Sequence, residues 1–313
     1  MPHPKSLAKN MMLLLVAILA AGMAACSRSS GSGNPSSAVN KGSVSRPGVT
    51  VSIEPQRYLL ERITGNTIDI DVIIPPGSNP ETFEPSLESL ALLEKEQVYF
   101  MIGTLPFEIS NRERLQSNFP HLQIYTAVET LHKLPHVHYG EEPEEHEEHG
   151  HEEETDPHVW TTPENLLAMS RDMLETMKRL YPDKTSEYEA NYRKLEKDLN
   201  QLNDSLVSIR RETKNNSFLI WHPTLAYFAH RYGYVQLSVE KEGKETTPED
   251  FREAIDKARS LDTRIAIVER EHNPAMLLSL NSDLRLKTIE ISVMEGDIIK
   301  NLIEIANAIR SAD

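Results

Sequence analysis

The chain has 313 residues, enough for one large or two ordinary domains, and its 39% hydrophobic and 26% charged residues fit a globular body with a sizeable core. The formal net charge of -15 argues against nucleic acid or an anionic membrane surface as the partner and agrees with a cationic ligand. Nine glutamates between Glu141 and Glu154 supply a large share of that charge.

The N-terminus has the plan of a secretory signal peptide. Lys5 and Lys9 precede an apolar run from Met11 to Ala20, which is too short to span a membrane, and small residues follow. The only cysteine, Cys26, comes directly after "GMAA", which resembles a bacterial lipobox. We therefore expect a signal peptide over residues 1–25 and a lipid anchor on Cys26, with an ordinary signal peptide and a free thiol as the alternative.

The residues after Cys26 fall into a short polar segment and a longer part with a different composition. Residues 26–47 are rich in Ser, Gly, Asn and Pro, which predicts a flexible tether. Beyond it, short β-rich runs alternate with helical patterns, which indicates βαβ units and mostly parallel sheets. Strands are expected at 48–53, 68–74, 97–102, 122–127, 217–221, 234–239, 264–269 and 286–291. A capping Thr or Asn followed by proline predicts helices at 163–180, 248–259 and 274–283.

One segment, residues 184–213, contains no Gly or Pro and carries apolar side chains at three- and four-residue spacing. These side chains are Tyr188, Tyr192, Leu195, Leu199, Leu202, Leu206 and Ile209. The pattern predicts an amphipathic helix of roughly 40 Å. We interpret it as a rigid connector between two α/β lobes, residues 48–183 and 214–313, with a coiled-coil arm as the alternative.

Four polar residues fall where β-rich runs end: Glu81, His158, His222 and Glu269. Ligands of open α/β sheets bind outside the carboxyl ends of the strands. A site between two lobes would therefore gather Glu81 and His158 from one lobe and His222 from the other. Two imidazoles and a carboxylate suit zinc, although each histidine taken alone is as compatible with a hydrogen-bonded core residue.

Three segments are similar, in order and spacing, to the signature segments of the zinc- and manganese-binding lipoproteins that serve bacterial ABC importers: "PPGSNPETFEPS", "DPHVW" and "WHPTLAYFAHRYG". The resemblance runs from about Gly48 to the C-terminus and includes the long helix. It implies an α/β protein of two Rossmann-like lobes with mostly parallel sheets, joined by that helix, with a metal site in the cleft between them. It also implies an exported, lipid-anchored monomer that carries zinc to an ABC permease and its ATPase and performs no chemistry.

The resemblance assigns metal ligands position by position. It implies that the second and third ligands are His158 and His222. The first ligand of the family is usually histidine, whereas this chain has Glu81 in its place. Histidine at the third position favours zinc, and the carboxylate at the first also suits manganese, so zinc is the expected metal and manganese the alternative.

The fourth ligand stays open. The family's fourth position, an aspartate in manganese-binding members, falls at Ser292, and a hydroxyl is a poor ligand at neutral pH. A water molecule, Glu269, Glu295 or Asp297 are the alternatives.

Residues 132–154 form a histidine- and glutamate-rich loop, and the resembled zinc importers carry a similar insertion before the second ligand. The segment has too little apolar surface to order itself, so we expect it to be mobile without metal. Its histidines are His132, His136, His138, His146, His149 and His151. Interleaved with carboxylates, they predict weak zinc binding that gathers metal or senses its level, with a solvated acidic loop as the alternative.

The same residues are also compatible with two other functions. Two histidines, one glutamate and a water also form a catalytic zinc set, so a zinc hydrolase is one alternative. The chain lacks an HExxH motif, because "HEEH" at 146–149 has the wrong spacing, and it lacks a nucleophile elbow. A surface metal buffer or adhesin is the other alternative.

Overall fold

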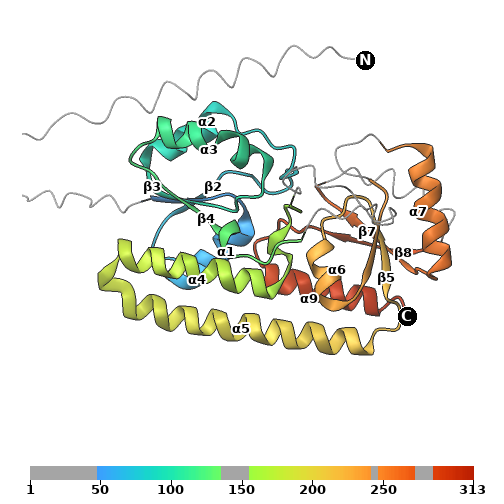
Figure 1. Ribbon diagram of the computed structural model, residues 1–313. Helices are drawn as coiled ribbons and strands as arrows, with labels where there is room; N and C mark the ends of the chain where they lie inside the picture. The colour runs from blue at the N-terminus through green and yellow to red at the C-terminus, as the bar shows by residue number, and fades with distance from the viewer. Residues whose placement is uncertain (1–47, 135–154, 241–245, 272–284) are drawn as a thin grey trace, which may run out of the picture. The chain divides into compact units, whose positions relative to one another are not determined.

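The computed structural model describes residues 48–134, 155–240, 246–271 and 285–313, all within the compact unit Ser45–Asp313 (Figure 1). Several predictions fall outside the described residues. They are the signal peptide at 1–25, the tether at 26–47 with Cys26, the helix at 274–283, and His136, His138, His146, His149 and His151 of the loop. In the described part of the chain, none of the helices combines the length and the apolar character needed to cross a membrane.

The first lobe is built on a parallel four-stranded sheet with the order β2-β1-β3-β4. Its strands are β1 (Gly48–Val51), β2 (Ile70–Val72), β3 (Glu96–Met101) and β4 (Gln123–Thr126). Its helices are α1 (Glu54–Thr64), α2 (Leu87–Leu92), α3 (Pro106–Asn118) and α4 (Pro163–Leu180). Figure 1 shows α2 and α3 on one face of the sheet and α1 and α4 on the other, so both faces are buried, as a parallel sheet requires.

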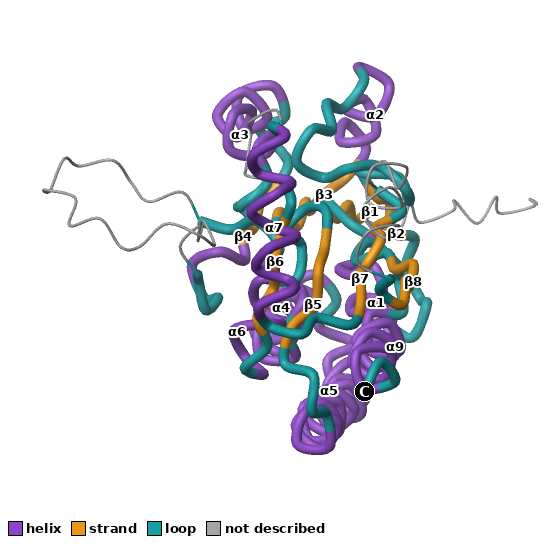
Figure 2. Tube along the Cα trace, turned by 90° about the vertical axis from the view of Figure 1, so that its right-hand side faces the viewer, coloured by secondary structure: helices purple, strands orange, loops and turns teal. Residues whose placement is uncertain are grey.

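The second lobe repeats this plan with the order β6-β5-β7-β8, again parallel throughout. Its strands are β5 (Ser217–Ile220), β6 (Val235–Ser238), β7 (Ile265–Glu269) and β8 (Lys287–Ile291). Its helices are α6 (Ala226–Tyr232), α7 (Pro248–Ser260) and α9 (Ile298–Arg310). In Figure 2 α7 lies in front of this sheet, and its Ala254 and Ala258 pack on Leu219 and Leu237.

Short 3₁₀ helices fill the connections: η1 (Leu93–Lys95), η2 (Ala127–Glu129), η3 (Val159–Thr161) and η4 (Pro182–Lys184). The one that matters for the site is η3, because it places the segment "DPHVW" directly before α4.

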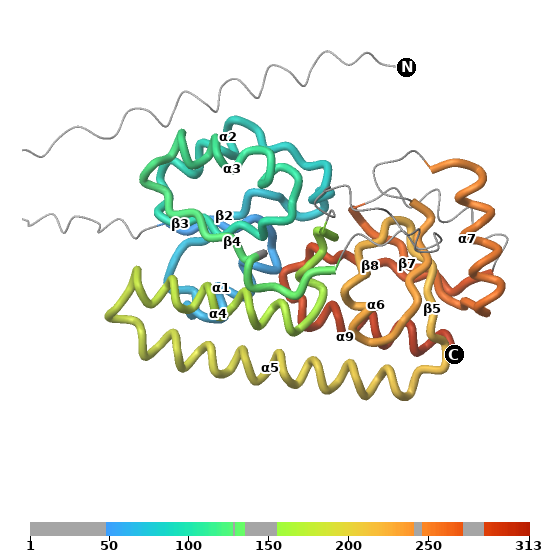
Figure 3. The backbone as a smooth tube through the Cα atoms, viewed as in Figure 1, coloured from blue at the N-terminus to red at the C-terminus, as the bar shows by residue number. Residues whose placement is uncertain are grey.

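The long helix α5 (Thr185–Glu212) has 28 residues and joins the two lobes. It contacts α1 and α4 of the first lobe and α6 and α9 of the second, and Figure 3 shows it running beneath both. All seven apolar residues of the predicted stripe are buried, which confirms the amphipathic pattern. Among the described residues, the larger of two hydrophobic clusters consequently extends from β1 through α5 to α9 and is shared by both lobes. The smaller cluster belongs to the second lobe alone, where α7 packs on the sheet.

The predicted fold class, two α/β lobes with parallel sheets joined by a long helix, is confirmed. Each of the eight predicted strands is present, with ends that differ from the prediction by two residues or fewer. Helix α4 spans the predicted residues, and α7 ends one residue later than predicted, at Ser260. Thr247 caps α7 by accepting a hydrogen bond from the backbone N–H of Asp250, the contact that a Thr-Pro helix start predicts.

Candidate metal centre

Three side chains from three different connections meet at one point. Glu81 lies in the loop after β2, His158 lies directly before η3, and His222 follows β5 by two residues. One ligand atom from each lies within 4.8 Å of the other two. Glu81 Oε1 is 3.0 Å from His222 Nε2 and 3.6 Å from His158 Nε2. The centroids of the two imidazole rings are 5.4 Å apart. The arrangement offers two nitrogen donors and a carboxylate to one cation.

The three side chains differ in exposure. His158 and His222 are 1% and 2% exposed, whereas Glu81 is 20% exposed. The backbone N–H of Glu81 donates to Asn79 Oδ1, a local turn contact. Among the described residues, His158 Nε2 has no hydrogen-bond partner. A buried nitrogen without a hydrogen-bond partner destabilises the folded protein. A cation bound between Glu81 and the two histidines would give this nitrogen a partner.

The segment that carries His158 is held from both lobes. Asp156 Oδ1 accepts a 2.8 Å hydrogen bond from the backbone N–H of His158 and lies 3.2 Å from its Nδ1. Thr104, from the loop after β3, donates to the carbonyl of Pro157. The fully buried Trp160 donates its indole N–H to the carbonyl of Val293 in the second lobe. These contacts leave His158 little freedom to move.

His222 is held by the strand next to its own. Glu269, the last residue of β7, accepts hydrogen bonds from the backbone N–H of His222 and from Thr224 Oγ1. β5 connects to β6 on one side and lies beside β7 on the other, so His222 and Glu269 flank the switch point where α/β sheets bind ligands. Burial raises the pKa of Glu269 to about 8, although His222 and the hydrogen bonds lower it.

The surroundings of His222 favour positive charge. Burial alone would lower its pKa, but contacts with Glu240 and Glu81, together with the charge of Glu269, raise the pKa to about 10. Glu240 Oε2 lies 3.4 Å from His222 Nδ1, on the side of the ring opposite Glu81. A divalent cation at Nε2 would benefit from the same negative field.

The residues considered for a fourth ligand are engaged elsewhere in the structure. Glu269 binds the loop of His222, as described above. Ser292 Oγ donates to Glu271, and Asp297 caps α9 by accepting from the backbone N–H of Lys300. Glu295 pairs with Arg270. Within the described part of the chain, the three-residue group includes none of these side chains.

His132, the one loop histidine that the structure describes, is not part of the group either. Its ring stacks against His230 of α6 with centroids 6.2 Å apart. Two residues that contact the site were not predicted from the sequence: Asp156 and Glu240. A signal was present for both, because Asp156 belongs to "DPHVW" and Glu240 follows β6 as closely as His222 follows β5.

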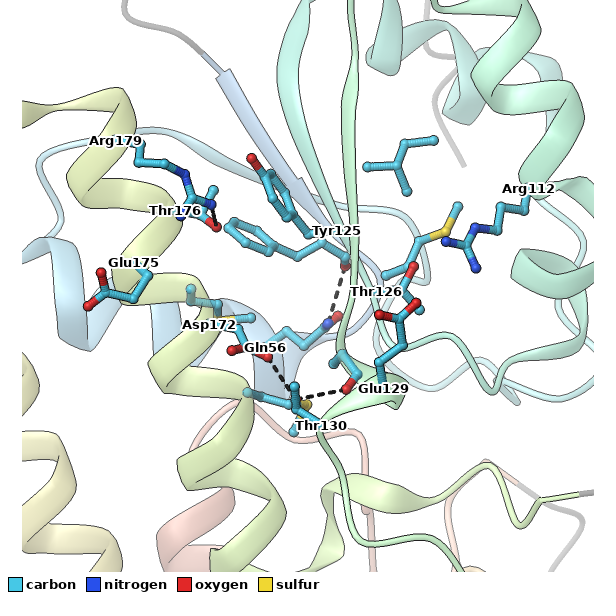
Figure 4. A pocket seen from close by; sticks show the side chains of 16 residues that line it. Gln56, Arg112, Tyr125, Thr126, Glu129, Thr130, Asp172, Glu175, Thr176 and Arg179 are labelled. Carbon is cyan, nitrogen blue, oxygen red and sulfur yellow. Dashed lines mark hydrogen bonds between the residues drawn. The ribbon is translucent and has the colours of Figure 1, made fainter.

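A separate cavity of about 330 Å³ lies in the first lobe between the end of β4 and α4 (Figure 4). Several of its polar side chains satisfy one another: Thr130 donates to Asp172, and Arg179 donates to Thr176. None of Glu81, His158 and His222 lines it. The candidate metal centre is therefore a different site.

The fold and the site geometry together define a two-lobed α/β binding protein whose candidate metal site lies beyond the carboxyl ends of its strands. The family "ZnuA: Zinc-uptake complex component A periplasmic" matches residues 49–312. Because this match covers most of the chain, the protein belongs to that family.

Individual relatives agree with this assignment. The zinc-binding lipoprotein AdcA of Streptococcus pneumoniae (strain ATCC BAA-255 / R6) is 23% identical over 296 residues, which cover 92% of this chain and 56% of AdcA. The chain thus spans about half the length of that relative. A crystal structure of ZnuA has a TM-score of 0.75 at 26% identity, covering 85% of this chain and 98% of its own. A ZnuA deletion mutant with zinc bound gives the same score and identity, covering 85% and 97%.

Proposed function

We propose that this protein captures zinc outside the inner membrane and delivers it to the permease of an ABC importer, with Glu81, His158 and His222 as the metal ligands. The observation that carries the proposal is the convergence of three donor atoms from both lobes within 4.8 Å. Membership of the zinc-uptake family supports the same function.

The donor set favours zinc. Zinc accepts imidazole nitrogen and carboxylate oxygen in four-coordinate sites, and two buried histidines with one glutamate supply three of the four positions. Asp156 lies beside His158 and Glu240 beside His222, and both carboxylates add negative charge. Solvent takes the fourth position in this proposal. Manganese is the competing cargo because carboxylate oxygen suits it as well.

Delivery requires a site that can also release its cargo, which means that its contacts must differ between the loaded and the docked states. The shared core and α5 oppose a wide hinge motion between the lobes. Glu81 is the most exposed ligand and lies in a long connection between β2 and α2. In contrast, the backbone of each histidine is held by a buried carboxyl group, His158 by Asp156 and His222 by Glu269. We therefore assign release to a movement of the Glu81 loop, and no bond of a substrate is broken in the cycle.

The proposal includes attachment to the cell envelope. AdcA is named as a lipoprotein, and the family is named as periplasmic. We propose that the chain is exported as a monomer, that Cys26 carries the lipid, and that the importer's permease and ATPase are its partners. Cys26→Ala should move the protein from the membrane fraction to the soluble fraction, and a variant that stays in the membrane fraction would contradict the anchor.

Metal analysis of the purified protein, followed by competition between zinc and manganese, tests the cargo. We expect one tightly bound zinc per chain, displaced by manganese only at large excess. His158→Ala and His222→Ala should each lose the tight site while keeping the circular dichroism of the wild type. Tight zinc binding that survives in both variants would overturn the ligand assignment.

Cell experiments separate import from the other functions. A strain that lacks the protein should accumulate less radioactive zinc from chelator-treated medium, and the wild-type gene but not His222→Ala should restore uptake. Normal zinc uptake in the deletion strain would favour a surface buffer or adhesin. Zinc-dependent turnover of generic esters or peptides by the purified protein would favour a hydrolase.

A further inference from the structure

We infer that Glu240 and Asp156 are positioning residues that hold a proton on Nδ1 of His222 and His158, leaving each Nε2 free for the metal. The inference rests on the proposed function, because it assigns roles at the same site. It goes beyond that function by naming one carboxylate from each lobe that sets the ligand form of an imidazole.

The two histidines are arranged alike. Each presents Nε2 to the shared Glu81 Oε1, at 3.0 Å for His222 and 3.6 Å for His158. Each presents Nδ1 to a carboxylate of its own, Glu240 at 3.4 Å and Asp156 at 3.2 Å. Both rings thus have one nitrogen toward the site and the other toward an acceptor.

A neutral imidazole has one N–H and one lone pair. When a metal takes the lone pair of Nε2, the proton must reside on Nδ1, and both rings are nearly inaccessible to water. A carboxylate at Nδ1 accepts that proton in a hydrogen bond, fixes the ring orientation and makes Nε2 a more basic ligand. Without the carboxylate, the buried N–H loses its acceptor.

The backbone explains why Glu240 lies beside His222. β5 and β6 are parallel partners with Ile220 opposite Ser238. The pairing continues past both strands, since the backbone N–H of Glu240 donates to the carbonyl of Trp221 at 2.9 Å. The register therefore places Glu240 next to the residue that carries the ligand imidazole.

The two carboxylates need different substitutions. Asp156 also accepts from the backbone N–H of His158, so its removal would disturb the loop itself. Asp156→Asn keeps an acceptor oxygen there. Glu240 is 26% exposed, so Glu240→Ala removes the acceptor without leaving a buried cavity. Glu240→Gln keeps an oxygen that can accept from Nδ1 and removes only the charge. The matched control is Glu290→Ala, which removes an exposed carboxylate of β8 that pairs with Arg270.

Zinc affinity by chelator competition and long-range ¹H–¹⁵N spectra of the zinc-loaded histidines test the inference. We expect Glu240→Ala to weaken zinc binding about 10- to 100-fold, the usual effect of losing such a partner. Glu240→Gln and Asp156→Asn should lose less affinity than Glu240→Ala, because each keeps an acceptor oxygen for Nδ1 and removes only the charge. Glu290→Ala should bind zinc as the wild type does. The wild-type spectra should show His222 protonated at Nδ1, with that proton exchanging faster in Glu240→Ala.

The outcomes are distinct. The positioning role would be overturned if Glu240→Ala bound zinc with wild-type affinity. It would also be overturned if Glu240→Gln and Glu240→Ala lost equal affinity and the Nδ1 proton exchanged as in the wild type. In both cases His222→Ala would still abolish tight binding. A wild-type protein that binds no zinc would instead overturn the proposed function, and this inference with it.

Discussion

Glu81 is the only carboxylate among the three proposed ligands, and it is the most exposed of them. In the structure Glu81 Oε1 lies near both imidazoles, so the carboxylate occupies the place that a ligand needs. Carboxylate oxygen is a harder donor than imidazole nitrogen, and it is better matched to manganese. The metal preference of the site should therefore depend on this side chain.

Glu81→His should keep tight zinc binding and increase the preference for zinc over manganese, by roughly tenfold or more if one donor decides the ratio. Parallel titrations with both metals on the wild type and the variant measure that ratio. Glu81→Ala is the control and should weaken both metals. An unchanged ratio in Glu81→His would show that Glu81 does not contact the metal.

Glu108 shows that a buried carboxylate can serve the fold instead of the site. It accepts hydrogen bonds from Ser52 Oγ and from the backbone N–H groups of Ile102 and Gly103, at the ends of β1 and β3. Burial raises its pKa from 4.5 to about 7, although these hydrogen bonds lower it. The folded protein therefore binds a proton at Glu108 that the unfolded chain has already released.

A carboxyl group whose pKa is higher in the folded than in the unfolded protein stabilises the fold at pH values below its unfolded pKa. This contribution to stability is lost as the pH rises through the folded pKa. The free energy of unfolding should therefore fall by about 3 kcal/mol on account of Glu108 between about pH 4.5 and pH 8. Urea unfolding of the wild type and Glu108→Gln across this range measures it. The difference in the free energy of unfolding between the two proteins should change with pH. If this difference were the same at every pH, the raised pKa of Glu108 would be contradicted.

At the scale of elements, α5 carries the connection between the lobes. Leu199 lies near the middle of its buried stripe and is fully buried. Leu199→Ala should lower the free energy of unfolding by about 2 to 5 kcal/mol, because it removes buried methyl groups and leaves a cavity. Gln201→Ala, on the exposed face of the same helix, should change it by less than about 0.5 kcal/mol. Denaturant unfolding of the two variants tests this, and similar losses in both would contradict the packing.

Leu134 and Asp156, on either side of residues 135–154, are joined by hydrogen bonds that do not involve that segment. The backbone N–H of Asp156 donates to the carbonyl of Leu134, and Tyr227 Oη accepts from the N–H of Leu134 and donates to the carbonyl of Asp156. A short linker can therefore replace residues 135–154 without separating these residues.

Replacing residues 135–154 by two glycines should leave one tight zinc site per chain and remove the weak ones, because the three proposed ligands lie outside the deleted segment. Isothermal titration with zinc counts both classes of site. Loss of the tight site, with the fold intact by circular dichroism, would place a ligand in the deleted segment.

At the scale of the whole molecule, the proposed ligands come from two lobes that share the larger hydrophobic cluster. Zinc at about 100 times its dissociation constant should stabilise the folded state by about 2.7 kcal/mol and raise the melting temperature by roughly 5 to 10 °C. Calorimetry should show one cooperative transition with and without zinc. Two transitions, only one of them moved by zinc, would mean that the lobes unfold separately.

Much of this architecture could be predicted from the sequence because its determinants are local. Alternating β-rich runs and proline-marked helix starts predicted the eight strands, α4 and α7 within two residues. The seven-residue stripe from Tyr188 to Ile209 predicted which face of α5 is buried, because 3.6-residue periodicity places those side chains on one side. The quoted motifs singled out Glu81, His158 and His222.

Only the tertiary structure decided what surrounds those residues. Glu240 meets His222 because of the β5–β6 register, and Glu269 turns toward the His222 backbone because β7 lies beside β5. Ser292 donates to Glu271, a partner distant in the chain that its chemistry alone does not reveal. The reason is physical: periodicity and capping act between near neighbours in the chain, whereas the contacts of a site join residues far apart in sequence and depend on how the strands are ordered.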